Sequence, residues 1–450
     1  MEIDVPSPPP PDLTILPSFS NIDFKHLASK DEAFSTLYAS TSGHLDFRDP
    51  LTLTVLTKAL LRTTFSLSLI LPPDRLCPPI PNRTSYISFL HALLDSTSPT
   101  YVPSPSRPIT GLDIGTGASA IYALLALRSR PNWHMCITDT DTLSFSYALK
   151  NLTQNALLPR TTALQTQPSD PLIPLSLLNH ATLDFVMCNP PFFSTEPEMH
   201  ISLSSSEKSH PANSICTGSA SEMICPGGDL GFATRIFSES LLLREKVTWY
   251  TCLFGKLASA RAIVAMLRDS GVSNWAARCI GHGHGQTGTR RWIVAWSFGD
   301  LRPSDEVVRG EGTQGGLGGF PTRYKISVPR DGDSVGVERA KQEVATKIYE
   351  KMDALDITWS WDMETFAGIG EARGNVWNRQ YRRSRMKEKS GGKDETGDVK
   401  REDDGAHELV ALAFRITVSG EGTEITIEWL RGTDVSLWES FCGMLHRVFR

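Results

Sequence analysis

A short apolar run ends abruptly in an asparagine, two prolines and two aromatic residues at positions 184–193, which read D-F-V-M-C-N-P-P-F-F. Four consecutive apolar residues are typical of a strand that is buried on both faces. Proline has no N–H for a sheet and fixes its own φ, so the strand must stop at Asn189. The amide oxygen of Asn189 and the carbonyl of Pro190 can accept hydrogen bonds from an exocyclic amine, and the Phe192 ring can stack on a planar group. The stretch therefore favours a planar, hydrogen-bonding ligand over a plain proline turn.

The pattern N-P-P-[FYW] resembles the signature of class I methyltransferases that modify planar amino or amide nitrogens. The predicted catalytic residues are Asn189, Pro190, Pro191 and Phe192, and Phe193 would back the pocket. The exocyclic nitrogen of adenine is a poor nucleophile because its lone pair is delocalised into the ring. Two acceptors would hold its N–H groups and aim it at an activated methyl group, so positioning supplies most of the catalysis and no general base is needed.

A second stretch, at 109–120, reads I-T-G-L-D-I-G-T-G-A-S-A and predicts a strand, a glycine turn and a helix. Glycine lets the backbone approach a ligand closely, and a helix N-terminus favours polar groups. The same residues also satisfy the NAD fingerprint G-x-G-x-x-[GA], so this loop alone does not decide whether the cofactor is NAD or S-adenosylmethionine. A dehydrogenase has no use for N-P-P-F after its fourth strand, which favours S-adenosylmethionine. The cofactor-binding residues predicted here and at the end of the next strand are Asp113, Gly115, Thr116, Gly117 and Asp139, the last for a ribose diol.

Strand and helix patterns alternate around these two stretches, as in an open α/β sheet. The predicted strands are 109–114, 133–138, 162–166, 183–188, 247–254, 275–280 and 291–298, and the predicted helices between them are 118–129, 141–156, 229–244 and 256–270. Seven strands with a closing hairpin are the layout of the class I S-adenosylmethionine-dependent methyltransferase, a doubly wound α/β sheet.

The rest of the chain predicts four further parts. They are a proline-rich disordered tail at 1–20, an N-terminal helical extension at 21–108 before the methyltransferase domain at 109–300, a glycine-rich linker at 301–323, and a small C-terminal α+β domain at 324–450. Within the extension, helices are expected from 22, at 51–71 and at 83–94. The last domain should contain strands at 324–328, 357–361, 409–418 and 423–429, helices at 337–355 and 435–449, and a disordered charged insertion at 371–402.

Composition narrows the function classes. The 450 residues carry a net charge of −5, so binding to nucleic acid must rely on local patches. The eight cysteines form no C-x-x-C, which predicts reduced thiols and neither a disulfide framework nor a metal site. No apolar run approaches membrane-spanning length, and the acidic, proline-rich start is unlike a signal peptide.

With these motifs placed, residues 20–300 resemble the methyltransferase-like protein 16 family of U6 small nuclear RNA adenosine-N6 methyltransferases, in a fungal-looking version. The matching segments include P-N-R-T-S-Y-I (81–87), G-L-D-I-G-T-G-A-S-A-I-Y (111–122), C-N-P-P-F-F (188–193), E-M-I-C-P-G-G-D-L (222–230) and R-W-I-V-A-W-S-F (291–298). The resemblance implies that Arg83 and Gly115 contact the cofactor and that Asn189 touches both cofactor and adenine. It also implies an RNA partner and a nuclear location, with the cytoplasm left open. The family's acid after the second strand is a glutamate, whereas this chain has the shorter Asp139.

The expected RNA contacts depart from the family. Its N-terminus and the loop after N-P-P-F carry arginines, whereas 194–226 contains no arginine here. The strongest basic patch of the sequence lies in the C-terminal domain and contains Arg379, Arg382, Arg383 and Arg385. Together with Phe193 and Arg291 of the methyltransferase domain, these are the predicted RNA-binding residues. A ribosomal-RNA adenine methyltransferase and a catalytically silent RNA-binding protein of the same fold remain the alternatives.

Overall fold

The computed structural model describes residues 13–19, 22–47, 49–204, 218–281, 290–310, 317–328, 337–381, 383–384, 410–419 and 424–450. The chain divides into two compact units. The first unit comprises Met1–Asp95, Pro103–Gly299 and Arg309–Gly319, and the second comprises Ser96–Val102, Asp300–Val308 and Phe320–Arg450. The division differs from the predicted boundaries, because the expected linker 301–323 is shared between the units and a short segment before the first strand belongs to the second.

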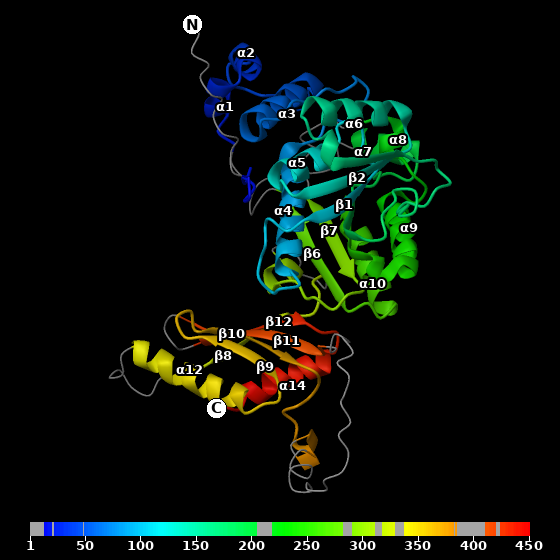
Figure 1. The fold of residues 1–450 in the computed structure, drawn as a ribbon. Helices are drawn as coiled ribbons and strands as arrows, with labels where there is room; N and C mark the ends of the chain where they lie inside the picture. The colour runs from blue at the N-terminus through cyan, green and yellow to red at the C-terminus, as the bar shows by residue number, and fades with distance from the viewer. Residues whose placement is uncertain are drawn as a thin grey trace. The chain divides into compact units, whose positions relative to one another are not determined.

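A seven-stranded sheet organises the first unit, in the order β3-β2-β1-β4-β5-β7-β6 (Figure 1). Its strands are β1 (Ile109–Ile114), β2 (Trp133–Asp139), β3 (Thr161–Gln165), β4 (Leu183–Cys188), β5 (Val247–Phe254), β6 (Asn274–Ile280) and β7 (Arg291–Ser297). β7 runs antiparallel to β5 and β6, and the other pairs are parallel. The predicted class I methyltransferase fold is confirmed, with each strand within about two residues of its expected bounds.

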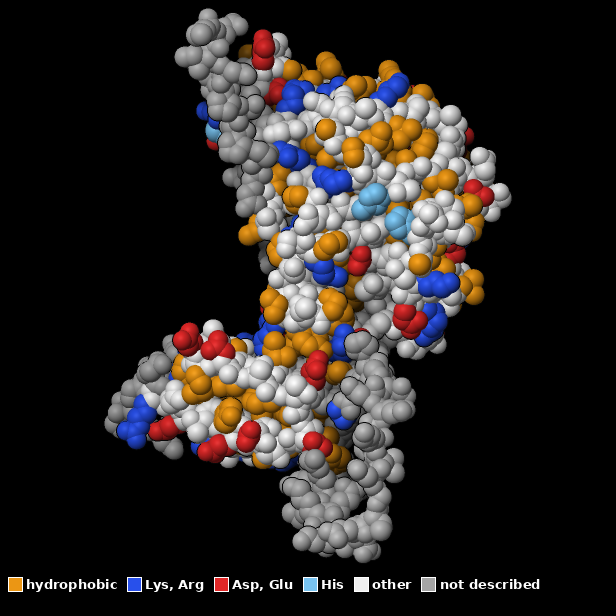
Figure 2. All heavy atoms as spheres, in the orientation of Figure 1, with side chains coloured by type: hydrophobic (Ala, Val, Ile, Leu, Met, Phe, Trp, Pro, Cys, Tyr) orange, Lys and Arg blue, Asp and Glu red, His pale blue; other side chains and the backbone are white. Residues whose placement is uncertain are grey.

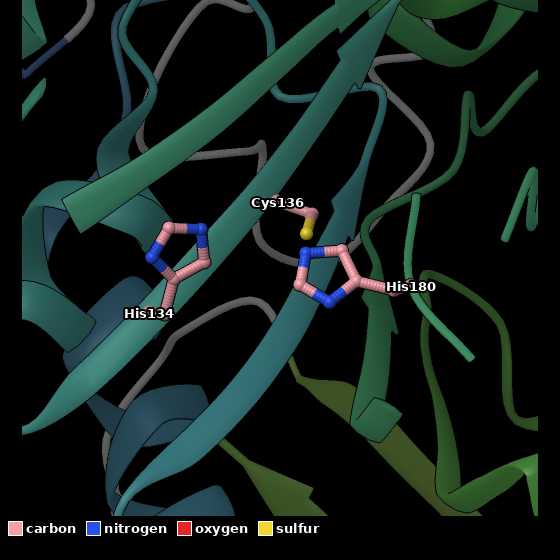
Figure 3. Close-up of side chains that lie close together, drawn as sticks. All are labelled: His134, Cys136 and His180. Carbon is pink, nitrogen blue, oxygen red and sulfur yellow. The ribbon is translucent and has the colours of Figure 1, made fainter. Parts of the chain in front are cut away.

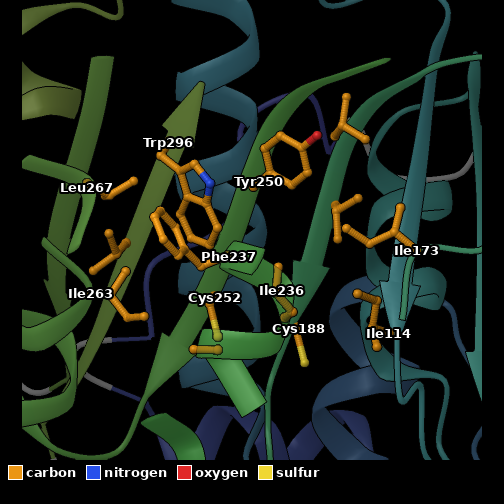
Figure 4. Close-up of a cluster of buried hydrophobic side chains, with 14 of the residues drawn as sticks. Ile114, Ile173, Cys188, Ile236, Phe237, Tyr250, Cys252, Ile263, Leu267 and Trp296 are labelled. Atoms are coloured by element: carbon orange, nitrogen blue, oxygen red, sulfur yellow. The ribbon is translucent and has the colours of Figure 1, made fainter. Parts of the chain in front are cut away.

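Helices cover both faces of this sheet. On one face, α9 (Gly228–Leu243), α10 (Leu257–Asp269) and the segment 171–182 bury a core in which Ile236, Tyr250 and Trp296 take part (Figure 4). On the other face lie α4 (Ile80–Ser96) and α5 (Ile121–Ser129), and the buried Tyr86 hydroxyl lies 2.7 Å from Thr251 Oγ1. The order in which strands are added to the sheet changes direction between β1 and β4. The crevice at the carboxyl ends of these two strands is therefore the expected ligand site of such a sheet.

The first unit contains further helices besides those named on the two faces of the sheet. They are α1 (Phe24–Lys30), α2 (Glu32–Ser40), α3 (Pro50–Phe65), α6 (Thr142–Gln154), α7 (Glu196–Ser204), α8 (Ala220–Met223) and the 3-10 turns η1 (Leu158–Arg160) and η2 (Arg244–Lys246). The predicted helix 51–71 was too long, because Ser66 adopts φ 52° and ends α3. None of the helices in the described ranges is long and apolar enough to cross a membrane.

The second unit is built on a five-stranded antiparallel sheet in the order β8-β12-β11-β10-β9. Its elements are α11 (Asp305–Val308), β8 (Arg323–Ser327), α12 (Val337–Asp353), β9 (Thr358–Asp362), β10 (Ala367–Ala372), β11 (Leu412–Val418), β12 (Glu424–Arg431) and α14 (Val435–His446). Residues of α12 and α14 share one buried core with this sheet, among them Ile348 and Phe441. On the face in view, acidic and basic side chains are interspersed over this unit (Figure 2).

Strand β10 was missed because its sequence, A-G-I-G-E-A, lacks the β-branched alternation of a strand. Its glycines make room for aromatic rings of neighbouring strands. A Cβ on Gly368 would lie 2.5 Å from Trp359, and one on Gly370 would lie 2.4 Å from the Phe414 ring. The predicted insertion 371–402 therefore began too early, since Glu371 still belongs to β10, an interior strand of the sheet.

Candidate active site

A cavity of ≈ 370 Å³ lies at the carboxyl ends of β1, β2 and β4. Six of the seven predicted cofactor-binding residues line it: Arg83, Gly115, Thr116, Gly117, Asp139 and Asn189. Pro190 and Pro191 also belong to its wall, whereas Asp113, Phe192 and Phe193 do not. The parallel strands bring the glycine loop and the N-P-P motif to one edge of the sheet, so two stretches far apart in sequence face the same space.

The glycine loop adopts a backbone that other residues rarely take. Gly115 has φ +67° and Gly117 φ +65°, both in the left-handed region, and a Cβ on Gly115 would meet nothing within 4 Å. The buried Asp113 carboxylate accepts a hydrogen bond of 2.8 Å from Thr116 Oγ1. Burial raises the pKa of Asp113 to about 7. Asp113 thus shapes the loop from behind and does not reach the cavity.

Asp139, at the end of the neighbouring strand β2, holds the glycine turn through its carboxylate. One of its oxygens accepts the Gly117 N–H at 2.8 Å and the other accepts the Asp141 N–H at 2.9 Å. Burial raises the pKa of this carboxyl despite both hydrogen bonds. The carboxylate lines the cavity while each oxygen keeps a further lone pair. A ribose contact from Asp139 stays a prediction.

Arg83 on α4 lines the cavity and contacts the N-P-P motif at Asn189. The residue is 5% exposed, and Nη1 donates a hydrogen bond of 2.7 Å to the Tyr122 hydroxyl. With the Asn189 amide turned so that both groups are satisfied, Oδ1 accepts from Nη1 and Nη2 of Arg83 at 3.2 and 3.1 Å. In that orientation, the amide oxygen expected to receive a base amine is bonded to Arg83.

The two phenylalanines of the motif are not among the residues that line the cavity. The Arg291 guanidinium lies 5.0 Å from the centroid of the Phe192 ring, and a Cβ on Gly255 would come within 3.0 Å of that ring. Phe193 instead forms a bridge with Ile224 through its backbone. Sequence reasoning assigned Phe192 to base stacking, whereas here Arg291 covers one face of its ring.

Several lining residues were not predicted. Thr166, Gln167, Pro168 and Asp170 come from the loop after β3, to which no cofactor residue had been assigned. Glu222 also lines the cavity, and its Oε2 accepts the Leu76 and Ser219 N–H groups at 3.1 and 3.0 Å. The segment E-M-I-C-P-G-G-D-L already carried that glutamate as a signal.

A sequence model of a family described as RNA methyltransferase matches residues 19–300. The chain belongs to this RNA methyltransferase family. Members take the transferred methyl group from S-adenosylmethionine, and the chain is accordingly an S-adenosylmethionine-dependent methyltransferase.

Relatives place the chain more narrowly within the RNA methyltransferase family. The U6 small nuclear RNA (adenine-(43)-N(6))-methyltransferase of Schizosaccharomyces pombe is 32% identical over 91% of this chain and 96% of that protein. The human RNA N(6)-adenosine-methyltransferase METTL16 is 36% identical over 62% of this chain, and the match spans only 49% of the human protein. The crystal structure of the hMettl16 catalytic domain in complex with MAT2A 3'UTR hairpin 1 superposes with a TM-score of 0.54 at 35% identity, covering 62% of this chain and 91% of that one.

The predicted RNA-binding arginines fall into two groups. Arg291 begins β7 in the first unit, beside Phe192. Arg379 and Arg383 lie exposed in the second unit, while Arg382 and Arg385 are outside the described residues. Arg235 on α9 was not predicted, yet it lines the cavity and lies 5.8 Å from the Phe232 ring centroid.

Proposed function

We propose that this chain methylates the N6 atom of an unpaired adenosine in U6 small nuclear RNA and works in the nucleus. The proposal is supported by its similarity to the S. pombe enzyme, which extends over nearly the whole of both proteins. The single observation that carries it is Asn189, which stands at the end of β4 beside the glycine loop and is bonded to the buried Arg83. A base edge and a cofactor bound in the cavity would meet at this point.

The cavity has features that suit S-adenosylmethionine. The Arg83 Nε atom is buried without a hydrogen-bond partner, which leaves a charged donor for the cofactor's carboxylate. Gly115 leaves open space where a side chain would stand, so its backbone can approach the ligand. Asp139 would hold the ribose, with Gly117 and Thr116 shaping the turn. When bound, the cofactor supplies an activated methyl group on a sulfonium, so the protein needs only to position the acceptor.

Asn189 and Pro190 would position the acceptor nitrogen. The direction of the Pro190 carbonyl is restricted, because Pro191 limits the backbone conformations of the residue before it. The Asn189 oxygen becomes available to an adenine N–H once its bonds to Arg83 lengthen, and a cofactor carboxylate that pairs with Arg83 would compete for the same guanidinium. Cofactor binding would thereby prepare the base pocket.

Phe192 would stack on the target base from a position next to Arg291. The guanidinium now covers one face of the ring, so a base that stacks there must displace it or use the other face. A displaced Arg291 would stand beside the RNA backbone, where a phosphate is its natural partner. The target adenosine must be unpaired or flipped out to enter.

The second unit would supply much of the RNA affinity. Arg379 and Arg383 are exposed, and the basic side chains of the β8 region are engaged with acids, for example Lys325 with Glu424 at 2.9 Å. Each phosphate contact that is removed should lower the salt slope of binding by roughly 0.7 to 0.9.

Purified full-length protein, S-adenosylmethionine and RNA transcripts test the proposal. Methylation of an unpaired adenosine in U6 small nuclear RNA, with no transfer to a large-subunit ribosomal RNA fragment, is the expected result. The opposite preference would replace the proposal with ribosomal-RNA methylation, and binding without transfer would leave an RNA-binding protein. Mapping N6-methyladenosine in total RNA with and without the protein extends the test to cells.

A double Arg379→Gln, Arg383→Gln variant tests separately whether these two arginines of the second unit contribute to RNA affinity. It should bind U6 RNA more weakly with a smaller salt slope, yet methylate a short single-stranded oligonucleotide at the normal rate. Lys347→Gln on α12, also an exposed basic residue of the second unit, is the matched control. Equal losses of RNA affinity in the two variants would show that the overall charge of the second unit matters and that Arg379 and Arg383 make no specific contact.

A further inference from the structure

Two histidines and a cysteine gather on one face of the first unit, away from the cofactor cavity. His134 and Cys136 lie two residues apart on β2, so their side chains point to the same face of the sheet. The segment 171–182 lies over that face, with Ile173 and Leu178 in the same core as Cys136. His180 lies near the end of this segment. Two histidine side chains are visible next to each other on the first unit in Figure 2.

The three side chains converge (Figure 3). Their potential ligand atoms all lie within 4.8 Å of one another, and the two imidazole centroids are 6.0 Å apart. A tetrahedral zinc ion with Zn–N of about 2.0–2.1 Å and Zn–S of about 2.3 Å places its ligand atoms roughly 3.3–3.6 Å apart. Closing the site therefore needs about an ångström of movement, which rotation of two half-buried histidine side chains can supply.

The position of His180 is set by its own turn. Its N–H donates to the Leu175 carbonyl at 3.0 Å, and Asn179 before it adopts φ 57° in the left-handed region. The segment is anchored at its other end by Glu239, whose carboxylate accepts the Leu172 and Ile173 N–H groups at 2.8 and 2.9 Å. An imidazole is thus held over a buried thiol by backbone geometry.

We propose that His134, Cys136 and His180 bind one zinc ion, with water in the fourth position. One thiolate and two imidazoles form a donor set that suits zinc, and hard cations such as Mg²⁺ prefer oxygen ligands. A simple polar cluster accounts for only part of the arrangement. His134 Nε2 lies 2.8 Å from Thr162 Oγ1, but that contact gives no reason for His180 to face the thiol.

The ion would fasten segment 171–182 to β2. Pro171 and Leu172, at the start of the segment, line the cofactor cavity, so the zinc would stabilise one wall of that cavity from behind. The ion would fix this segment and take no part in methyl transfer, because the site lies near the beginning of β2 while Asp139 at its end lines the cofactor cavity. The pattern H-x-C with a distant histidine is no zinc motif, which is why the scattered cysteines predicted no metal.

Metal analysis of the full-length protein tests the site. Protein equilibrated with zinc and then freed of unbound metal should retain about one equivalent, and Co²⁺ should produce visible d–d bands with a thiolate-to-cobalt charge-transfer band. Cys136→Ser should abolish the charge-transfer band, and His180→Ala should weaken binding at least about tenfold. Zinc should also raise the melting temperature of the wild type but not of Cys136→Ser.

Cys279→Ser on β6 and His26→Ala on α1 are matched controls, one a half-buried cysteine and the other an exposed histidine. Both should keep full metal content. Wild-type protein that retains no zinc and shows no charge-transfer band would overturn the proposal without any variant. A charge-transfer band that survives in Cys136→Ser, or disappears in Cys279→Ser, would place the ion elsewhere and overturn it equally.

Discussion

Replacing Asn189 with alanine separates catalysis from binding at the centre of the site. The side chain would hold the acceptor nitrogen, and removing one positioned polar contact of this kind costs about 10²–10³ in rate, or about 2.7–4 kcal/mol. Asn189→Ala also takes away the acceptor for two Arg83 donors at 3.2 and 3.1 Å. Hydrogen bonds to a charged group contribute about 1.5–3 kcal/mol each, so the protein should also lose some stability.

Tyr122→Phe is the matched control for the stability effect. It removes the 2.7 Å hydrogen bond from Arg83 to the Tyr122 hydroxyl while leaving Asn189 in place. Its stability loss should be similar, but its methyl transfer should fall less than about tenfold, because it touches no reacting atom.

Single-turnover transfer from radiolabelled S-adenosylmethionine measures the rate, and fluorescence anisotropy measures RNA affinity. RNA affinity should change little in either variant, since phosphate contacts dominate it. If Asn189→Ala kept a rate within about tenfold of the wild type, or Tyr122→Phe lost as much as Asn189→Ala, the assignment of the base pocket would be wrong.

Three further predictions follow from the cavity and the second unit. Asp139→Ala should weaken both S-adenosylmethionine and S-adenosylhomocysteine in calorimetric titration, because it faces the cavity and fixes the Gly117 N–H at 2.8 Å; unchanged affinity would move the ribose contact elsewhere. Burial raises the pKa of Asp113 to about 7, so the stability it contributes is fully present below its ordinary pKa and is lost as the pH rises through 7. Asp113→Asn should therefore flatten the fall in melting temperature between about pH 4 and pH 7, and a wild-type slope in this variant would contradict the reasoning. Gly370→Ala would place a Cβ 2.4 Å from the Phe414 ring and should cost about 1–3 kcal/mol in urea unfolding with cofactor affinity unchanged; no loss would show that the ring moves freely.

Local patterns determined much of this protein. Buried parallel strands read as apolar runs, and the glycine turn and N-P-P stop depend only on residues a few positions apart, so the seven strands and two motifs were predictable. A glycine-rich strand such as β10 carries no such pattern, because its stability comes from rings on β9 and β11. That strand could be recognised only from its neighbours.

Tertiary packing decided how the motif residues are used. Asn189 gives its oxygen to Arg83 from a distant helix, and Phe192 lies under Arg291 from a later strand. His134 and Cys136 meet His180 only because a connecting segment folds over their strand. The physical reason is shared by all three: a side chain's residue type and its immediate neighbours determine what it can bond, but the partner that it bonds is determined by which parts of the chain the fold brings within a few ångströms.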